Sequence, residues 1–290
     1  MEPSALVCMI GFDYQRILDG IKYWYARRGI QKTYLLYDKK KDKYGFASAH
    51  NARELEKDLK LFNPQLIGYN PQSYEDTFVT LYGIIKHEVD QNRNQLLVDC
   101  TSGTKEAYGA AITISLMSEG VSVYIVPANK RGTEVPEHDQ ETCPACNGSG
   151  RLSFVEWFTE KRGIGGLTPQ VIHLPGNRLE RPTKEEEFVL TRLEEHKGQA
   201  ESIKALITWC GENPFDSAIK NRFSRMVSKL CNAGFLEEEV GSKLKPLKLT
   251  EYGRIFSRSL KAHQSIDAKS YGKSLPKSES LFLEKNAMST

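Results

Sequence analysis

Short apolar runs and amphipathic stretches alternate through the first 126 residues, and no other feature constrains the fold as strongly. The apolar runs end near Phe12, Tyr37, Tyr69, Thr101 and Val126. Between them, apolar side chains recur every three to four positions, which is the spacing of an amphipathic helix. Continuous apolar strands that alternate with helices are typical of a parallel sheet covered on both faces. The sequence therefore predicts an α/β fold whose first domain, residues 1–175, is a Rossmann-like, mostly parallel sheet.

The alternation stops at residues 127–168, which are rich in glycine and proline. A stretch of this length without a pattern predicts an irregular insert that is functional or flexible. The apolar run 170–174 predicts a sixth strand that pairs beside the fifth. Residues 175–182 predict a linker, and the serine-rich residues 263–290 predict a disordered tail.

Residues 183–262 predict a small second domain of a different kind. Thr183 is followed by Glu186 three positions later, which is the capping-box signal of a helix start. The predicted elements are helices from 183, over 203–210 and over 217–233, extended runs over 235–239 and 246–250, and a closing helix over 251–260. Three helices, a hairpin and a closing helix in this order predict a winged helix-turn-helix domain.

The overall composition leaves any nucleic-acid binding to a local patch, because the net charge is only +3. With 10% aromatic residues the chain is not expected to be disordered. No apolar run approaches the roughly 20 residues that a membrane span needs. The apolar N-terminal run lacks a basic leader and a cleavage site, so it predicts a first strand rather than a signal peptide. We therefore expect a cytoplasmic protein with no membrane partner.

Charge divides the second domain into two parts. Residues 184–216 carry 4 basic and 8 acidic side chains, whereas residues 217–261 carry 10 basic and 4 acidic ones. Arginine, asparagine and lysine on the polar face of the third helix could contact bases and phosphates in a DNA groove. The residues predicted to bind double-stranded DNA are Asn221, Arg222, Arg225, Ser228 and Lys229 of this helix and Lys243 of the wing. The alternatives are a solvated helix face, or a winged helix that serves dimerisation or protein contact.

The loop after the fourth strand has the composition of an anion site. It leaves a buried strand at Asp99 and enters a helix near Lys105. Gly103 permits a tight turn, and the helix N-terminus offers free amides and a positive dipole. The residues predicted to hold a ligand there are Thr101, Ser102, Gly103, Thr104 and Lys105. The spacing is neither that of a Walker A loop nor G-x-G-x-x-G, and the alternative is a capped turn.

The loop after the first strand has a similar character. Gly11, Phe12, Asp13 and Tyr14 lead from the strand into a helix, which Asp13 could cap. Tyr14 and Arg16 could reach a ligand over the same sheet edge, although the loop could equally be an ordinary cap. In a doubly wound sheet the loops after strands one and four flank a single crevice. The sequence therefore predicts one ligand site built from both loops.

These features resemble the CRISPR-associated Rossmann-fold (CARF) family. The stretch from Asp99 to Lys105 matches a D-x-T-x-G-T-K loop after strand four, and the loop from Gly11 to Tyr14 matches more loosely. The resemblance covers roughly residues 1–175, with residues 183–262 similar to the effector of archaeal-type winged-helix regulators. It implies a homodimer that binds a cyclic oligoadenylate across its two-fold axis.

In that resemblance the Ser102–Lys105 side of the site would hold phosphates or ribose, and the Gly11–Tyr14 side would line a second wall. Adenine would need stacking partners. Phe12, Tyr14 and Tyr69 are candidates for that role, and the alternative is that each is a packing residue. The insert 127–168 departs from a minimal domain of this family.

Six cysteines are present, of which four are embedded in apolar stretches and predict small core residues. Cys143 and Cys146 form a C-x-x-C pair that could provide half of a zinc site. His138 could be a third ligand, or a dimer could supply four thiolates. The alternatives are a plain loop and a redox dithiol.

Together these features predict a homodimeric, ligand-responsive transcriptional regulator that senses cyclic oligoadenylate in CRISPR-related defence. The alternative is an enzyme, either a nuclease that cleaves the cyclic ligand or a ribonuclease. Arg258 and His263 have the R-x4-H spacing of such ribonucleases, but they lie at the end of the predicted winged helix. A nucleotide-dependent metabolic enzyme is disfavoured, because the sequence holds no nucleophile elbow and no H-E-x-x-H motif.

Overall fold

The computed structural model describes residues 3–62, 64–130, 154–173, 179–238 and 246–262. Its main sheet has the strand order β3-β2-β1-β4-β5-β6. The strands are β1 (Pro3–Ile10), β2 (Gly29–Asp38), β3 (Gln65–Tyr69), β4 (Gln95–Asp99), β5 (Val121–Ile125) and β6 (Gln170–Val171). The first five are mutually parallel, with Val7 paired to Tyr34 of β2 and to Val98 of β4. The predicted Rossmann-like, mostly parallel α/β sheet is confirmed.

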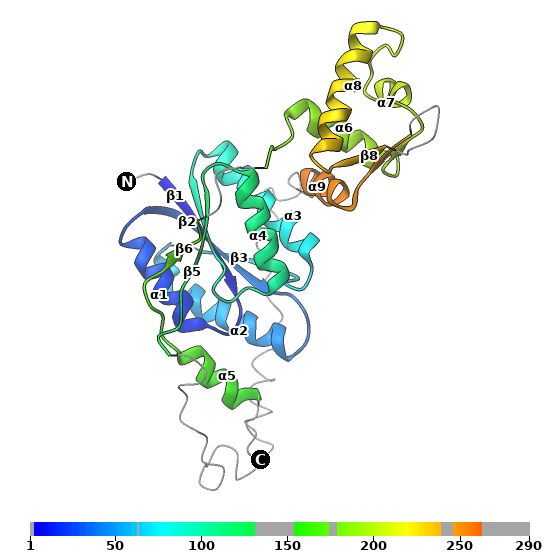
Figure 1. The fold of residues 1–290 in the computed structure, drawn as a ribbon. Coiled ribbons are helices and arrows are strands. Elements are labelled where there is room, and N and C mark those ends of the chain that lie inside the picture. Colours follow the sequence, from blue (N-terminus) through cyan, green and yellow to red (C-terminus); the bar gives the residue numbers. More distant parts are fainter. Residues whose placement is uncertain (1–2, 63, 131–153, 174–178, 239–245, 263–290) are drawn as a thin grey trace.

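The predicted sixth strand is present but short, and it runs antiparallel to β5 through the pair Tyr124 and Val171. Helices cover both faces of the sheet (Figure 1). They are α1 (Tyr14–Tyr25), α2 (Lys43–Asp58), α3 (Tyr74–Ile85) and α4 (Lys105–Met117), with a 3₁₀ turn over Lys60–Phe62 and a π-helical turn over Lys86–Gln91. Side chains alternate along β1, so that Leu6 and Cys8 pack with α1 and α2 while Val7 and Met9 pack with α3 and α4.

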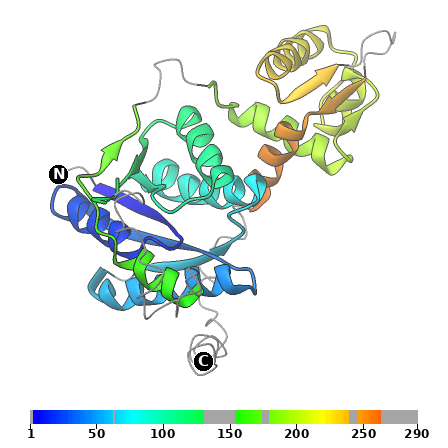
Figure 2. The same ribbon diagram turned by 60° about the horizontal axis from the view of Figure 1, so that its bottom comes forward.

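The insert holds a helix that the sequence analysis did not predict. This helix, α5 (Phe154–Gly163), lies beside α1 and α2 below the sheet in Figure 1 and in front of it in Figure 2. The following strap is fastened to the sheet, because the Gly166 amide donates to Asp19 Oδ2 at 2.8 Å. A Cβ on Gly166 would lie 2.4 Å from Val126 Cγ1, so only glycine fits this contact. The prediction of an insert without regular structure is therefore wrong over α5.

The second unit contains the predicted helices and the two predicted extended runs, in the predicted order. They are α6 (Lys184–Glu195), α7 (Ile203–Trp209), α8 (Ser217–Asn232), β8 (Leu236–Glu238), β9 (Leu247–Leu249) and α9 (Glu251–Ala262). The short strand β7 (Gln199–Ala200), between α6 and α7, was not predicted. Both bonds of the capping box are present, since Thr183 Oγ1 accepts from the Glu186 amide and Glu186 accepts from the Thr183 amide. The strands form a small antiparallel sheet in the order β7-β9-β8.

The two units share a continuous apolar core, and α9 lies along α3 (Figures 1 and 2). Phe256 of α9 contacts Tyr82 of α3, with ring centroids 5.2 Å apart. A polar cluster borders this contact. In it Glu187 accepts from Lys86 Nζ at 2.9 Å, and Arg181 Nη2 pairs with Asp90 at 2.8 Å. The end of the predicted linker is therefore tied to the first unit. No helix in the described part of the chain is both long and apolar enough to cross a membrane.

Candidate functional site

The candidate site lies where β1 and β4 are neighbours. The connection from β1 leads to α1 on one face of the sheet, and the connection from β4 leads to α4 on the other face. Such a switch point opens a crevice outside the carboxyl ends of the strands, which is where open α/β sheets bind ligands. The predicted juxtaposition of the two loops is therefore present.

The two loops touch each other directly. The Ser102 hydroxyl donates to Asp13 Oδ2 at 2.9 Å and accepts from the Asp13 amide at 3.2 Å. A Cβ on Gly11 would lie 2.5 Å from Ser102 Oγ and 2.7 Å from the Ser102 carbonyl oxygen. Glycine at position 11 is therefore what allows this approach, and the loops form one continuous wall at the sheet edge.

The start of α4 provides the donors of the site. Thr104 is the N-cap, and its side chain accepts from the Ala107 amide at 3.2 Å. The amides of Lys105 and Glu106 begin the helix, where no preceding helical carbonyl can accept from them. The Lys105 side chain is exposed at the same end of the helix. Two open amides, the helix dipole and one ammonium group together favour an anion.

Asp99 shapes the β4 loop from beneath. Its Oδ1 accepts from the Thr101 amide at 2.8 Å, and its side chain is completely buried. Burial raises the pKa of Asp99 to about 6, while hydrogen bonds to Thr101 act in the opposite direction. A carboxyl group that is this buried is costly to ionise, so its ionised form lowers the stability of the folded protein.

Several residues predicted to face a ligand have structural partners instead. Thr101 Oγ1 accepts from the Val126 amide at 2.9 Å and joins the ends of β4 and β5. Arg16 donates to the Val126 carbonyl oxygen through Nε at 2.9 Å. The Tyr14 hydroxyl donates to Asp58, and Tyr69 is 1% exposed, so Tyr69 is a packing residue and offers no stacking surface.

Asp13 lies at the N-cap position of α1, but its side chain makes no capping bond. The prediction that the Asp13 side chain caps this helix is therefore wrong. The Asp13 carboxylate instead pairs with Arg16 Nη1 at 2.8 Å and with Lys161 Nζ at 3.1 Å. Two cations and the Ser102 hydroxyl thus surround one carboxylate, which leaves a positive balance around it.

The helix α5 brings residues to this edge that the sequence analysis missed. Trp157 meets the Phe12 ring edge-on at a centroid distance of 5.0 Å, and Phe158 lies 6.2 Å from Phe12. The Arg162 guanidinium lies 4.8 Å from the centroid of the Tyr14 ring. The signal for this helix was present in the sequence, because residues 154–162 contain no glycine or proline and their aromatic residues recur at helical spacing.

The predicted DNA-binding face of α8 divides into paired and exposed residues. Arg222 pairs with Glu212 at 2.7 Å and with Glu185 at 3.3 Å. Lys229 pairs with Glu186 at 3.2 Å and with Glu180 at 3.4 Å. Asn221, Arg225 and Ser228 are exposed. Glutamates of the second unit and of the linker therefore neutralise two of the predicted cations, Arg222 and Lys229. Of the predicted cations that the structure describes, Arg225 is the one with no carboxylate partner among the described residues.

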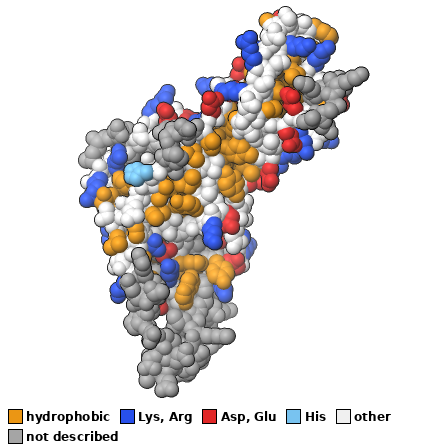
Figure 3. Space-filling model, in the orientation of Figure 1, with side chains coloured by type: hydrophobic (Ala, Val, Ile, Leu, Met, Phe, Trp, Pro, Cys, Tyr) orange, Lys and Arg blue, Asp and Glu red, His pale blue; other side chains and the backbone are white. Residues whose placement is uncertain are grey.

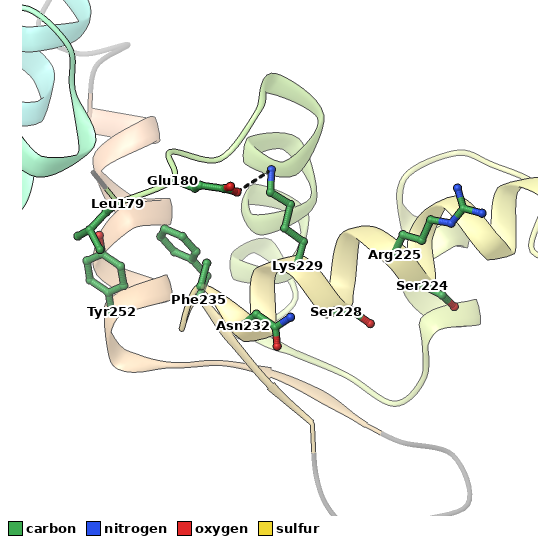
Figure 4. Close-up of a pocket in the computed structure, with 10 residues that line it drawn as sticks. Leu179, Glu180, Ser224, Arg225, Ser228, Lys229, Asn232, Phe235 and Tyr252 are labelled. Atoms are coloured by element: carbon green, nitrogen blue, oxygen red, sulfur yellow. Dashed lines mark ion pairs between the residues drawn. The ribbon is translucent and has the colours of Figure 1, made fainter. Parts of the chain in front are cut away.

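A cavity of about 740 Å³ runs along α8 (Figure 4). Lys229 extends across it toward Glu180, while Leu179, Phe235 and Tyr252 gather at the C-terminal end of the helix (Figure 4). Phe235 and Tyr252 are stacked at 5.0 Å. The linker residue Leu179 therefore walls the groove beside α8 at the end nearer the first unit.

Some predicted residues fall outside the part of the chain that the structure describes. They are Cys143, Cys146 and His138 of the zinc hypothesis, Lys243 of the wing, His263 of the ribonuclease alternative, and the tail 263–290. Arg258, the other half of the R-x4-H spacing, pairs with Glu75 at 2.7 Å and with Glu194 at 3.1 Å. Among the described residues, no group of three or more His, Cys, Asp or Glu side chains could hold a metal ion.

No protein-family model and no curated protein matches the chain. Solved structures that align with it include Csm6 from Enterococcus italicus bound to cyclic hexa-2'-fluoro-hexa-dAMP, with 11% identity, a TM-score of 0.38, and coverage of 81% of this chain and 57% of that one. Protein VC1899 from Vibrio cholerae aligns with 10% identity, a TM-score of 0.30, and coverage of 88% and 64%. Can2 from Sulfobacillus thermosulfidooxidans in complex with cyclic tetra-adenylate aligns with 11% identity, a TM-score of 0.32, and coverage of 92% and 68%.

The chain therefore spans 57% and 64% of the length of the first two of these proteins. At these TM-scores the likeness decides neither family nor function.

Proposed function

We propose that the chain is a CARF-type sensor of a cyclic oligoadenylate, and that its second unit binds double-stranded DNA and regulates transcription in CRISPR-related defence. The observation that carries the sensing half is the direct contact of the β1 and β4 loops through Asp13 and Ser102 at the switch point. This contact joins the open amides of α4 and Lys105 to the wall made by the β1 loop. A phosphate has the charge and the acceptor oxygens that such a site favours.

The ligand class rests on the D-x-T-x-G-T-K resemblance of the β4 loop together with this geometry. A cyclic oligoadenylate carries a phosphate on every nucleotide, so it needs more than one anion site. A two-fold homodimer supplies two copies of the same site to one symmetric ligand. We place the dimer contact on the α4 side of the first unit, where Tyr108 is 37% exposed and hydrophobic side chains gather over the middle of the molecule (Figure 3).

The second unit supports the DNA-binding half through the exposed face of α8. Asn221 lies in the N-terminal half of this helix and Arg225 lies at its middle, and both are exposed. Arginine can donate two hydrogen bonds to guanine, and asparagine can bind adenine in the same way. The docking of α9 on α3, together with the packing of α6 against α9, provides a route by which a change at the sheet edge would reach α8. Such coupling requires that the ligand bind one arrangement of the dimer more tightly than another.

A thermal-shift assay with several nucleotides tests the sensing half. Cyclic tetra-adenylate should raise the melting temperature of the protein, because a ligand that binds only the folded state stabilises it by mass action. Linear tetra-adenylate and ATP should raise it less at the same concentration. Lys105→Ala should remove most of the shift, whereas Lys57→Ala, which alters an exposed lysine of α2, should keep it. Equal shifts with Lys105→Ala and with Lys57→Ala would contradict the site.

A further inference from the structure

We propose that α5 is the nucleobase-binding wall of the ligand site, in which Trp157 and Tyr44 flank an adenine while Lys161 and Arg162 hold the adjoining phosphate. This inference rests on the proposed function and names residues that the resemblance to the family does not supply. It starts from the position of α5, which two kinds of contact fix against the β1 loop.

The first kind of contact is ionic and runs through Asp13. One carboxylate oxygen of Asp13 accepts from Ser102, and the other lies 3.1 Å from Lys161 Nζ. The Asp13 carboxylate therefore links Lys161 to Ser102, which belongs to the loop that would hold a phosphate. Asp13 is also paired with Arg16, so Lys161 could turn to a ligand and still leave that carboxylate with a cation. A third of the Lys161 side chain is exposed, so it is open to such a ligand.

The second kind of contact is aromatic and centres on Phe12. Its ring lies 5.0 Å from that of Trp157 and 6.2 Å from those of Phe158 and Tyr44. Trp157 is 36% exposed and Tyr44 is 48% exposed. Three elements, the β1 loop, α2 and α5, thus contribute rings to one aromatic patch, in which Phe158 is buried while Trp157 and Tyr44 face solvent. Base stacking on aromatic side chains is the usual means by which proteins hold unpaired bases.

Cations accompany this aromatic patch. The Arg162 guanidinium lies 4.8 Å from the Tyr14 ring and 5.8 Å from the Phe158 ring. Lys43 Nζ lies 5.1 Å from the Tyr44 ring. Rings and cations therefore lie together at this edge, which suits a ligand that carries both bases and phosphates. A metabolite that carried an anion alone would not need the rings.

The strap that follows α5 holds the wall in place. The Gly166 amide donates to Asp19 of α1, and Arg16 of the same helix donates to the Val126 carbonyl oxygen. The Asn129 amide donates to the Gly165 carbonyl oxygen at 3.0 Å. These bonds fix the C-terminal end of α5, where Lys161 and Arg162 lie, to α1 and to the end of β5. The helix end that carries the two cations is therefore positioned before a ligand arrives, which lowers the entropy cost of binding.

Calorimetric titration of the full chain with cyclic tetra-adenylate tests the proposal with paired variants. Trp157→Ala should weaken binding about tenfold or more, the range expected when a stacked base loses its ring. Trp157→Phe keeps a ring and should restore most of the affinity. Lys161→Gln should weaken binding and reduce its dependence on salt concentration, because one phosphate contact is lost. Phe215→Ala and Lys57→Gln, which alter an exposed ring of the second unit and an exposed lysine of α2, should bind as the wild type does.

A fluorescence signature separates direct contact from an indirect structural effect. Stacking of adenine on Trp157 should quench part of the tryptophan emission, and Trp157→Phe should abolish the quenching while it keeps binding. Trp24 is 7% exposed and Trp209 belongs to the second unit, so neither is expected to respond.

Wild-type affinity in both Trp157→Ala and Lys161→Gln, with weakened binding in Lys105→Ala, would overturn the α5 wall and leave the proposed sensor intact. Absence of binding in the wild-type protein would overturn both.

Discussion

The buried carboxyl group of Asp99 gives the sharpest quantitative test of the structure. Burial raises its pKa from 3.8 to about 6. The folded state therefore holds this proton more tightly than the unfolded state does, and the associated stability is present below pH 4 and lost as the pH rises through about 6. Asp99→Asn removes the ionisation and keeps an oxygen that can accept from the Thr101 amide.

The magnitude follows from the shift. About two pKa units correspond to about 3 kcal/mol of free energy of unfolding lost by the wild type at high pH. About half of this loss, roughly 1.4 kcal/mol, falls between pH 5 and pH 8 when the two-state linkage relation is integrated. All other titrating groups are common to both proteins, so the difference between variant and wild type isolates Asp99.

Urea denaturation of both proteins at pH 5 and pH 8 measures this difference. Asp99→Asn should gain about 1.4 kcal/mol relative to the wild type on going from pH 5 to pH 8, whatever its offset at pH 5. That gain corresponds to a midpoint shift of about 0.5 M urea at the slope usual for a chain of this size. A constant difference at the two pH values would refute the assignment of Asp99 as a buried group that ionises at a cost.

Further predictions concern the two loops, the DNA face and the cysteine pair. Gly11→Ala places a methyl group against Ser102. It should therefore lower the free energy of unfolding by about 1–3 kcal/mol in urea denaturation, and it should weaken the binding of cyclic tetra-adenylate in calorimetry. An unchanged free energy of unfolding and unchanged binding would show that the loops need not touch. Arg225→Ala should reduce binding of a DNA fragment in a mobility-shift assay more than Lys229→Ala does, because Lys229 already has two carboxylate partners; the reverse order would place the DNA elsewhere. Cys143→Ser should release bound zinc in elemental analysis, and wild-type protein purified without zinc would remove the zinc hypothesis.

The sheet was predictable because its first five strands carry apolar runs that alternate with helices of clear period. The loops after β1 and β4 could be placed together from topology alone, since strand order in a doubly wound sheet fixes which loops share a crevice. The antiparallel direction of β6 was not predictable. It depends on the path of the insert, which is set by tertiary contacts such as that of Gly166 with Asp19.

Side-chain partners were the part of the site that the sequence could not specify. Asp13 occupies a capping position, yet the neighbouring Arg16, Lys161 and Ser102 recruit its carboxylate. Arg222 and Lys229 belong to a basic stretch, but Glu185 and Glu186 at the start of α6 lie close enough to pair with them. Each outcome depends on the angle and distance between elements far apart in sequence. The helix α5 could have been predicted, because its aromatic residues recur at helical spacing. It was overlooked because glycine-rich segments lie on either side of it in the sequence.

The most direct test of the sensor is the stoichiometry of cyclic tetra-adenylate binding, measured by calorimetry on protein whose mass in solution is determined in parallel. We expect one ligand for every two chains, a dimeric mass, and weaker binding in Lys105→Ala. Binding of one ligand to each chain, or no binding by a correctly folded protein, would contradict the proposal that two copies of the Asp13–Ser102 site hold one cyclic oligoadenylate.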